Sequence, residues 1–239
     1  MKKIFLFIAA AVMTAGVVSA QDINQATESY NNGAMELQMG NNGAAIEYFQ
    51  SALTMGEALG DEGAELVANC KKAICSARLS MAKDLYNAKD FEGALTAFQS
   101  AKETAEGYGE AEIAAEAADL MNQTNMLKLS TEGKAAMKAK DFATAISCFS
   151  KVLEMDPENG ATALQLGQAY MNAGQLNEAV AALETAKANG QETNAAKLLS
   201  NIYLKQAQAA NKAKAKEYYE QIVNDPQYGA TAQEQLKTL

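Results

Sequence analysis

The sequence predicts an all-α protein built as an array of helix-turn-helix units. Three observations support this fold class. The 239 residues include only 2 Pro and 16 Gly, so few residues interrupt regular helices. A three-residue apolar pattern with helical spacing recurs five times along the chain, and a short polar turn precedes each copy. Apolar residues make up 49% of the chain and charged residues 21%, a balance typical of a folded globular protein.

The recurring pattern consists of an Ala, a large apolar or aromatic residue four positions later, and a small or branched apolar residue seven positions later. This spacing places all three side chains on one face of a helix. The Ala lets a neighbouring helix approach closely, and the large residue fills the space beside it. The five copies are Ala45-Phe49-Ala52, Ala94-Phe98-Ala101, Ala145-Phe149-Val152, Ala179-Leu183-Ala186 and Ala215-Tyr219-Ile222.

A second helix is expected before each copy. A small residue stands about twelve positions before the Ala in four units and further away in the fifth: Gly33, Ala82, Gly133, Gly167 and Ser200. Turns are expected at 40–43, 89–90, 140–141, 174–175 and 209–212. Gly and Asn tolerate the left-handed conformation that ends a helix, and Asp or Asn caps the next one. Each unit is therefore a helix, a short turn and a helix.

The five Ala anchors are 49, 51, 34 and 36 residues apart. The excess in the first two steps falls at 61–88 and 109–139, which lack Pro and are rich in helix-forming residues. We therefore predict elongated first helices in the second and third units; a break at 122–125 would instead create an extra helix. Residues 228–238 are predicted to form a terminal helix that covers the end of the array.

The 34-residue step and the positions of the small and large residues resemble the tetratricopeptide repeat. The match is strongest over residues 126–226. The fourth unit carries Leu166-Gly167, Tyr170, Gly174, Ala179, Leu183 and Ala186 after Pro157, and the fifth carries Leu199-Ser200, Tyr203, Ala215, Tyr219 and Pro226. Residues 22–107 match more loosely, and no unit has the Trp often found at the family's fourth position. The resemblance implies a single α-solenoid of about five repeats over 21–239, with a C-terminal capping helix.

The first twenty residues differ from the rest. Lys2 and Lys3 precede an apolar run over 4–13, and the segment ends in the small residues Val18-Ser19-Ala20. This pattern is typical of a secretory signal peptide cleaved before Gln21, so we expect a periplasmic or secreted mature protein without a transmembrane segment. An uncleaved membrane anchor is the alternative, but residues 4–20 are short for a span of roughly 20 residues.

The composition argues against several functions. The chain has no His, which removes Ser-His and Cys-His nucleophiles and most zinc sites. The carboxylate pairs Asp61-Glu62 and Glu110/Glu112 stand at predicted helix starts, where they favour the helix dipole. No glycine-rich phosphate loop is present. We therefore expect no enzymatic activity, cofactor or metal. The net charge of −9 argues against nucleic-acid binding.

The three cysteines, Cys70, Cys75 and Cys148, are an odd number and do not form a disulfide framework. We interpret them as small buried residues; pairing of one of the first two with Cys148 is the alternative. Charge is uneven: residues 21–70 hold eight acids and no Lys or Arg, whereas 128–239 hold twelve acids and twelve Lys. The acidic segment is either a solvated face or a patch that docks a basic partner.

The family resemblance implies that the first helices line a concave groove that binds peptide segments. Two positions one turn apart in each first helix point into it: Ala34 and Gln38, Lys83 and Asn87, Lys134 and Lys138, Gln168 and Asn172, Asn201 and Lys205. None is acidic, and the amides can pair with a peptide backbone. Lys197 and Asn201 also resemble the Lys–Asn pair with which some members bind a C-terminal carboxylate, although that clamp draws on two following units and only a terminal helix follows here.

The predicted function is therefore an exported, non-catalytic scaffold that binds a protein or peptide, with an acidic or C-terminal segment as the expected ligand. A self-associating structural protein, or a fixed subunit of a cell-envelope assembly, is the alternative. The oligomeric state, which light scattering measures, separates the two.

Overall fold

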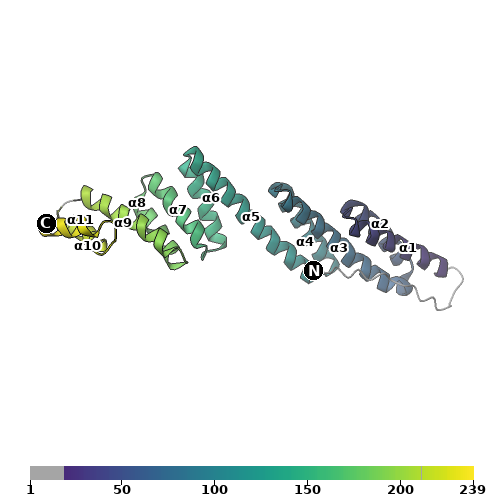
Figure 1. Cartoon of the computed structure of the whole chain (residues 1–239). Coiled ribbons are helices and arrows are strands. Elements are labelled where there is room, and N and C mark those ends of the chain that lie inside the picture. Colours follow the sequence, from purple (N-terminus) through teal and green to yellow (C-terminus); the bar gives the residue numbers. More distant parts are fainter. Residues whose placement is uncertain (1–18, 211) are drawn as a thin grey trace. The chain divides into compact units, whose positions relative to one another are not determined.

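The fold is all-α, as predicted. The computed structural model describes residues 19–210 and 212–239, and these ranges contain helices and no strand (Figure 1). The α-helices are α1 (Ser19–Gln38), α2 (Asn42–Ala58), α3 (Ala64–Asn87), α4 (Phe91–Tyr108), α5 (Ala111–Ala139), α6 (Phe142–Met155), α7 (Gly160–Asn172), α8 (Leu176–Ala188), α9 (Glu192–Ala209), α10 (Lys212–Gln221) and α11 (Gly229–Thr238), with a 3-10 turn, η1, at Gly60–Gly63. Residues 1–18 of the predicted signal peptide lie outside the described residues.

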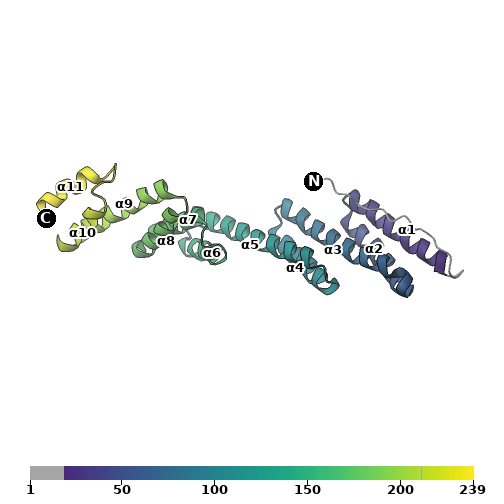
Figure 2. The same cartoon turned by 90° about the horizontal axis from the view of Figure 1, so that it is seen from below.

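The helices pair in the predicted order: α1 packs on α2, α3 on α4, α7 on α8 and α9 on α10. Helices α5 and α6 share a core cluster, and α11 follows α10. The chain forms two compact units, one up to Asn125 and one over Met126–Leu239. Within each unit, consecutive helices pack side by side (Figures 1 and 2). The expectation of one continuous array over 21–239 stays a prediction.

Both predicted elongated helices are present. Helix α3 has 24 residues and α5 has 29. No break occurs at 122–125 in α5. Thr124 is fully buried there, and its hydroxyl donates to the Leu120 carbonyl at 2.6 Å, which satisfies the polar group without leaving the helix.

The Ala anchors form the contacts between paired helices. Ala45, Ala94, Ala145 and Ala179 are fully buried, and Ala215 is nearly so. The preceding small residues face the large residue of the same unit: a Cβ on Gly133 would lie 2.6 Å from the Phe149 ring, and one on Gly167 would lie 2.6 Å from Leu183. Close helix approach therefore depends on the small residue of the first helix as well as on the Ala.

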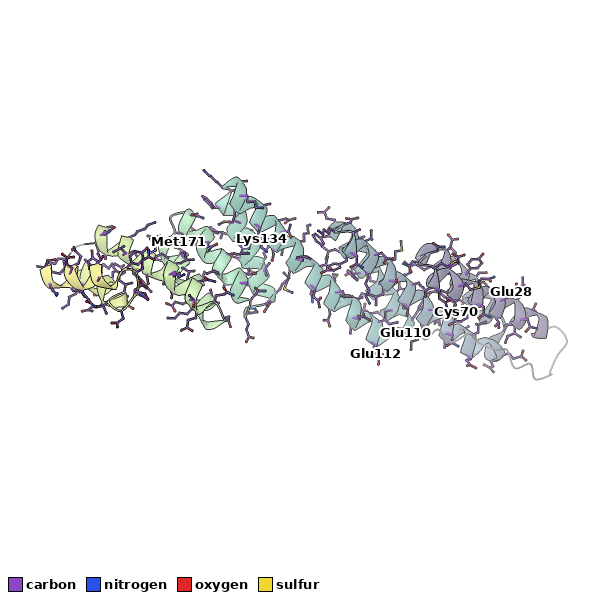
Figure 3. All side chains as sticks on the ribbon, viewed as in Figure 1. Glu28, Cys70, Glu110, Glu112, Lys134 and Met171 are labelled. Carbon is purple, nitrogen blue, oxygen red and sulfur yellow. The ribbon has the colours of Figure 1, made fainter. Side chains whose placement is uncertain are left out.

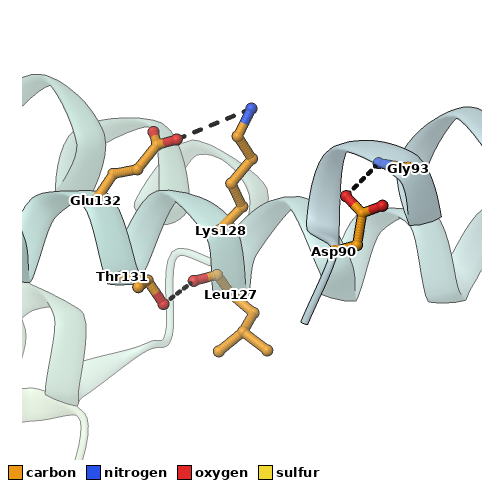
Figure 4. Close-up of polar contacts among 6 residues, drawn as sticks. All are labelled: Asp90, Gly93, Leu127, Lys128, Thr131 and Glu132. Carbon is orange, nitrogen blue, oxygen red and sulfur yellow. Dashed lines mark hydrogen bonds and ion pairs between the residues drawn. The ribbon is translucent and has the colours of Figure 1, made fainter. Parts of the chain in front are cut away.

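Two turns use a left-handed residue that is not glycine. Lys89 and Lys140 have φ values of 63° and 61°, the conformation that Gly40 and Gly174 adopt in the equivalent turns. Each Lys precedes an Asp that caps the next helix. Asp90 Oδ1 accepts from the Gly93 N–H at 3.0 Å (Figure 4), and Asp141 Oδ1 accepts from the Thr144 N–H at 3.1 Å. The cap holds the turn although L side chains disfavour this φ.

All three cysteines are free and buried, in agreement with their interpretation as small core residues. Burial raises the pKa of Cys70 to about 12 and that of Cys75 to about 11, so both stay protonated thiols at neutral pH. Cys70 lies inside the core that α1, α2 and α3 share (Figure 3).

Candidate functional site

The candidate binding residues of the second unit lie one and five positions after the small residues Gly133, Gly167 and Ser200. We call these six residues, on α5, α7 and α9, the first-helix face: Lys134, Lys138, Gln168, Asn172, Asn201 and Lys205. The spacing fixes their direction, because the small residue of each helix points at its partner helix. Helices α7 and α9 also contact each other. Lys134 is seen on α5 in Figure 3.

The first-helix face is polar, accessible and without internal partners. Lys134, Lys138, Asn172 and Lys205 are exposed, whereas Gln168 and Asn201 are half-buried. Within the described part of the chain, none of these six side chains forms a hydrogen bond or an ion pair. Glu132, the acid nearest in sequence to Lys134, pairs instead with Lys128 at 3.8 Å (Figure 4). The amines are therefore free to bind an external anion, and the amides to bind a peptide backbone.

Lys197 lies on α9 one turn before Asn201 and is exposed. A separation of four residues puts the two side chains on the same side of the helix. Among the described residues, neither has an internal partner. The pair can offer one charged donor and one amide donor to a carboxylate.

The corresponding residues of the first unit differ. Lys83 Nζ donates to Glu116 Oε1 at 2.6 Å, so its charge is already paired within the unit. Asn87 and Gln38 are exposed. Ala34 was expected in the groove, but it is only 3% exposed and packs in the core with Ile74. That expectation is wrong, because an apolar methyl at this position packs against α3 more favourably than it faces water.

Two long-range polar contacts hold α9 in place, and the sequence pattern did not reveal either. Ser200 donates to Asp225 Oδ2 at 2.6 Å, which ties α9 to the loop before α11. Asp225 Oδ1 also accepts from the backbone N–H groups of Gln227 and Tyr228, each at 2.8 Å. Gln206 Nε2 donates to Asn177 Oδ1 of α8 at 3.5 Å. The Asp225 carboxylate stands 25 residues from Ser200, beyond any helical spacing.

Burial alone would raise the pKa of Asp225, but the three hydrogen bonds outweigh it and lower that pKa below its ordinary value. The carboxylate is thus ionised over the physiological range. It anchors Ser200, which stands immediately before Asn201 of the first-helix face.

The acidic pairs noted in the sequence lie at or just before the starts of helical segments. Asp61 and Glu62 lie in η1, and Glu112 lies in the first turn of α5. In the described ranges, no group of three or more His, Cys, Asp or Glu side chains could hold a metal ion.

A cavity of about 450 Å³ in the first unit lies between the end of α4 and the start of α5. Its lining consists of Lys102, Glu106, Gly109, Ala111, Ala114, Ala115 and Ala118. Lys102 and Glu106 pair with each other at 3.6 Å.

No helix in the described ranges is both long and apolar enough to cross a membrane. The family model described as "Tetratricopeptide repeat" matches residues 136–202, which span the end of α5 to the middle of α9. No curated protein sequence matches the chain.

Solved structures similar to this chain include three with tetratricopeptide repeats. The TPR domain of P58(IPK) is 17% identical, with a TM-score of 0.39, covering 89% of this chain and 64% of that chain. YrrB, described as a TPR protein with an unusual peptide-binding site, is 16% identical, with a TM-score of 0.34, covering 94% of this chain and 100% of that chain. The TPR2AB domain of yeast Sti1, in complex with pHSP90, is 12% identical, with a TM-score of 0.35, covering 93% of this chain and 97% of that chain.

The paired helices, the small-to-large contacts and the capped turns define a helical repeat protein. The family model matches residues 136–202, so this stretch, from the end of α5 to the middle of α9, resembles the tetratricopeptide repeat.

Proposed function

We propose that the chain is a non-catalytic scaffold that binds a protein or peptide segment on its first helices. The observation that carries this proposal is the first-helix face itself. Three successive first helices present accessible amines and amides at equivalent positions, without partners inside the described chain. Tetratricopeptide repeats are generally scaffolds without catalytic activity. A row of polar groups left free in this way fits an external ligand better than a role in stability.

The expected ligand is an acidic segment or a free C-terminal carboxylate. Lys134, Lys138 and Lys205 supply positive charge on the first-helix face, and Lys197 adds a fourth amine beside Asn201. Within the first unit, Lys83 and Asn87 offer the same chemistry, with Lys83 released from Glu116 by a competing carboxylate. Exposed pairs of this kind contribute only about 0–1 kcal/mol each, so binding would depend on several acting together.

The test replaces Lys134, Lys138, Lys197 and Lys205 with Glu. The control replaces four exposed lysines on second helices or α11: Lys151, Lys212, Lys216 and Lys237. The two variants carry the same net charge. The probe is a synthetic acidic peptide with a free C-terminus, compared with its amidated form. We expect the first-helix variant to bind more slowly and with weaker salt dependence, and the control to bind like the parent.

Equal loss in both variants would show diffuse attraction and contradict the proposal. Equal affinity for the free and amidated peptides would remove the carboxylate role of Lys197 and Asn201 while leaving acidic-segment binding intact. Melting temperatures of both variants should stay close to that of the parent, because all eight lysines are exposed.

We further propose that the protein is exported to the periplasm or beyond. The support is the sequence of the first twenty residues, with Lys2 and Lys3, the apolar run and the Val18-Ser19-Ala20 end. N-terminal sequencing of protein recovered from the cell envelope should give Gln21 as the first residue. Recovery of a chain that still begins at Met1 would contradict cleavage.

A further inference from the structure

Helix α1 has a face that, in later repeats of the chain, packs against the helix of the preceding repeat. The residues of a first helix that face the preceding repeat stand at up to four positions: five and one before, and two and six after, the small residue. On α9 these are Ala195, Leu199 and Ile202, all buried in a core with Ala179 and Leu183 of α8, and Gln206, which bonds to Asn177 of α8. The second helix of one repeat therefore covers this face of the next.

Some of the same positions are covered on α7 and α3, whereas Ala173 directly after α7, Met81 of α3 and Ala88 directly after α3 are exposed. On α7, Thr162, Leu166 and Ala169 are buried, and Leu166 and Ala169 share a core with Phe149 of α6. On α3, Ala77 is buried in the core it shares with Phe49 of α2, and Asp84 accepts from Asn42 Nδ2 of α2 at 2.7 Å. A preceding helix thus covers this face on α9, most of it on α7 and part of it on α3.

On α1 the same positions are Glu28, Asn32, Met35 and Met39, which we call the end face. Here the two methionines are exposed, Met35 by 53% and Met39 by 62%. Glu28 is exposed and Asn32 half-exposed. At 100° per residue the four side chains lie within one narrow stripe of α1. Met side chains adapt to varied apolar partners, so an exposed pair in a stacking position favours docking.

The charge around the end face determines which partner fits. The described part of α1 carries Asp22, Glu28 and Glu36 and no basic residue. Residues 21–125 hold 17 Asp and Glu against 6 Lys and Arg, a net of −11. A second copy docking by its own end face would bring like charges together, which opposes association. A basic partner meets complementary charge.

We infer that the end face binds an amphipathic helix of a basic partner protein, which packs on α1 as the second helix of a preceding repeat would. The covering element in the three internal repeats is a helix, and the methionines supply the apolar contact. Glu28 and its acidic neighbours attract the Lys or Arg side chains that flank the partner's apolar stripe. This surface is separate in residues and opposite in charge from the first-helix face of the second unit.

The test measures binding of two synthetic amphipathic helices to the full mature chain by fluorescence anisotropy. One peptide carries Leu on one face and Lys on the other; its counterpart carries Glu in place of Lys. The chain variant is Met35→Ser with Met39→Ser, and the matched control is Met155→Ser, since Met155 is 38% exposed on α6, a second helix. We expect the Lys peptide to bind the double variant about tenfold more weakly or worse, and the control variant about equally.

A charge arm compares Glu28→Lys with Glu57→Lys, both exposed acids of the first repeat. Only the first should weaken binding of the Lys peptide, by about threefold or more. The inference is overturned if the Met35/Met39 variant binds as tightly as the parent, or if the Glu peptide binds equally well. It is also overturned if light scattering shows a dimer of the parent that the Met35/Met39 variant loses, because a second copy then covers the end face.

Discussion

Replacing Ala145 with Leu tests the register of the third repeat. Ala145 lies on α6, is fully buried, and shares a core cluster with Ala136 of α5, Phe149, and Leu166 of α7. An isobutyl group in place of this buried methyl must displace the side chains that surround it. Inserting such a group into a packed core costs about 1–3 kcal/mol in unfolding free energy.

The matched control is Ala143→Leu on the same helix, where the side chain is exposed. Ala and Leu have similar helix propensities, so this variant should stay within about 0.5 kcal/mol of the parent. Urea unfolding followed by circular dichroism measures both. We expect a lower midpoint for Ala145→Leu with an unchanged slope, since the native contacts and not the unfolded state are altered.

A second substitution shows whether the cost is steric. Leu166→Ala removes volume from the same cluster, so the double variant Ala145→Leu/Leu166→Ala should be more stable than the sum of the two single changes predicts. Coupling between neighbouring core residues is typically about 0.5–3 kcal/mol. If Ala145→Leu unfolds at the same midpoint as Ala143→Leu, the predicted contact between α6 and its neighbours is wrong.

Three further predictions follow from particular contacts. Lys140→Gly should raise the unfolding free energy by about 0.5–1 kcal/mol in urea melts, because it relieves a left-handed L residue at φ 61°. Ser200→Ala should lower the melting temperature, because it removes the donor to Asp225 at 2.6 Å. Because the pKa of Asp225 is lowered in the folded protein, its ionised carboxylate stabilises the fold at pH values above the ordinary Asp pKa of about 3.9. This stabilisation is lost as the pH falls below that value through the lowered pKa. The melting temperature of Asp225→Asn should therefore fall less in acid than that of the parent.

Helical spacing made much of the fold predictable. The anchors such as Ala94 repeat at positions that only a helix brings together, and the missing Pro in 109–139 correctly favoured a long helix. The left-handed φ of Lys140 was less visible, since Lys is a poor marker for that conformation and only the following Asp141 cap indicates a turn. The Ser200–Asp225 bond was out of reach, because pairing across 25 residues leaves no periodic trace.

The candidate site was predictable to a lesser degree. Repeat register correctly indicated that Lys134 and Lys205 are exposed, because equivalent positions in similar helices have similar surroundings. The register failed at Ala34, which is buried against α3, and it did not reveal that Lys83 pairs with Glu116. Both depend on which side chain happens to face the position from a neighbouring helix. The binding role of these residues stays a prediction.

The first three Ala anchors are 49 and 51 residues apart, and the structure of α3 and α5 explains these long intervals. The first half of α3 carries Leu66, Cys70 and Ile74 into the core with α1 and α2, while its second half carries Leu79 and Ala82 into the core with α4. One helix thus completes the first repeat and begins the second.

Helix α5 has the same division of roles. Its start supplies Ala117 and Leu120 to the core with α4, and its end supplies Ala136 to the core with α6. A 34-residue repeat contacts the preceding repeat by stacking alone. The extended helices α3 and α5 add about four helical turns that contact the two helices of the preceding repeat. The extra length of α3 buries apolar side chains against α1 and α2, and that of α5 buries them against α4.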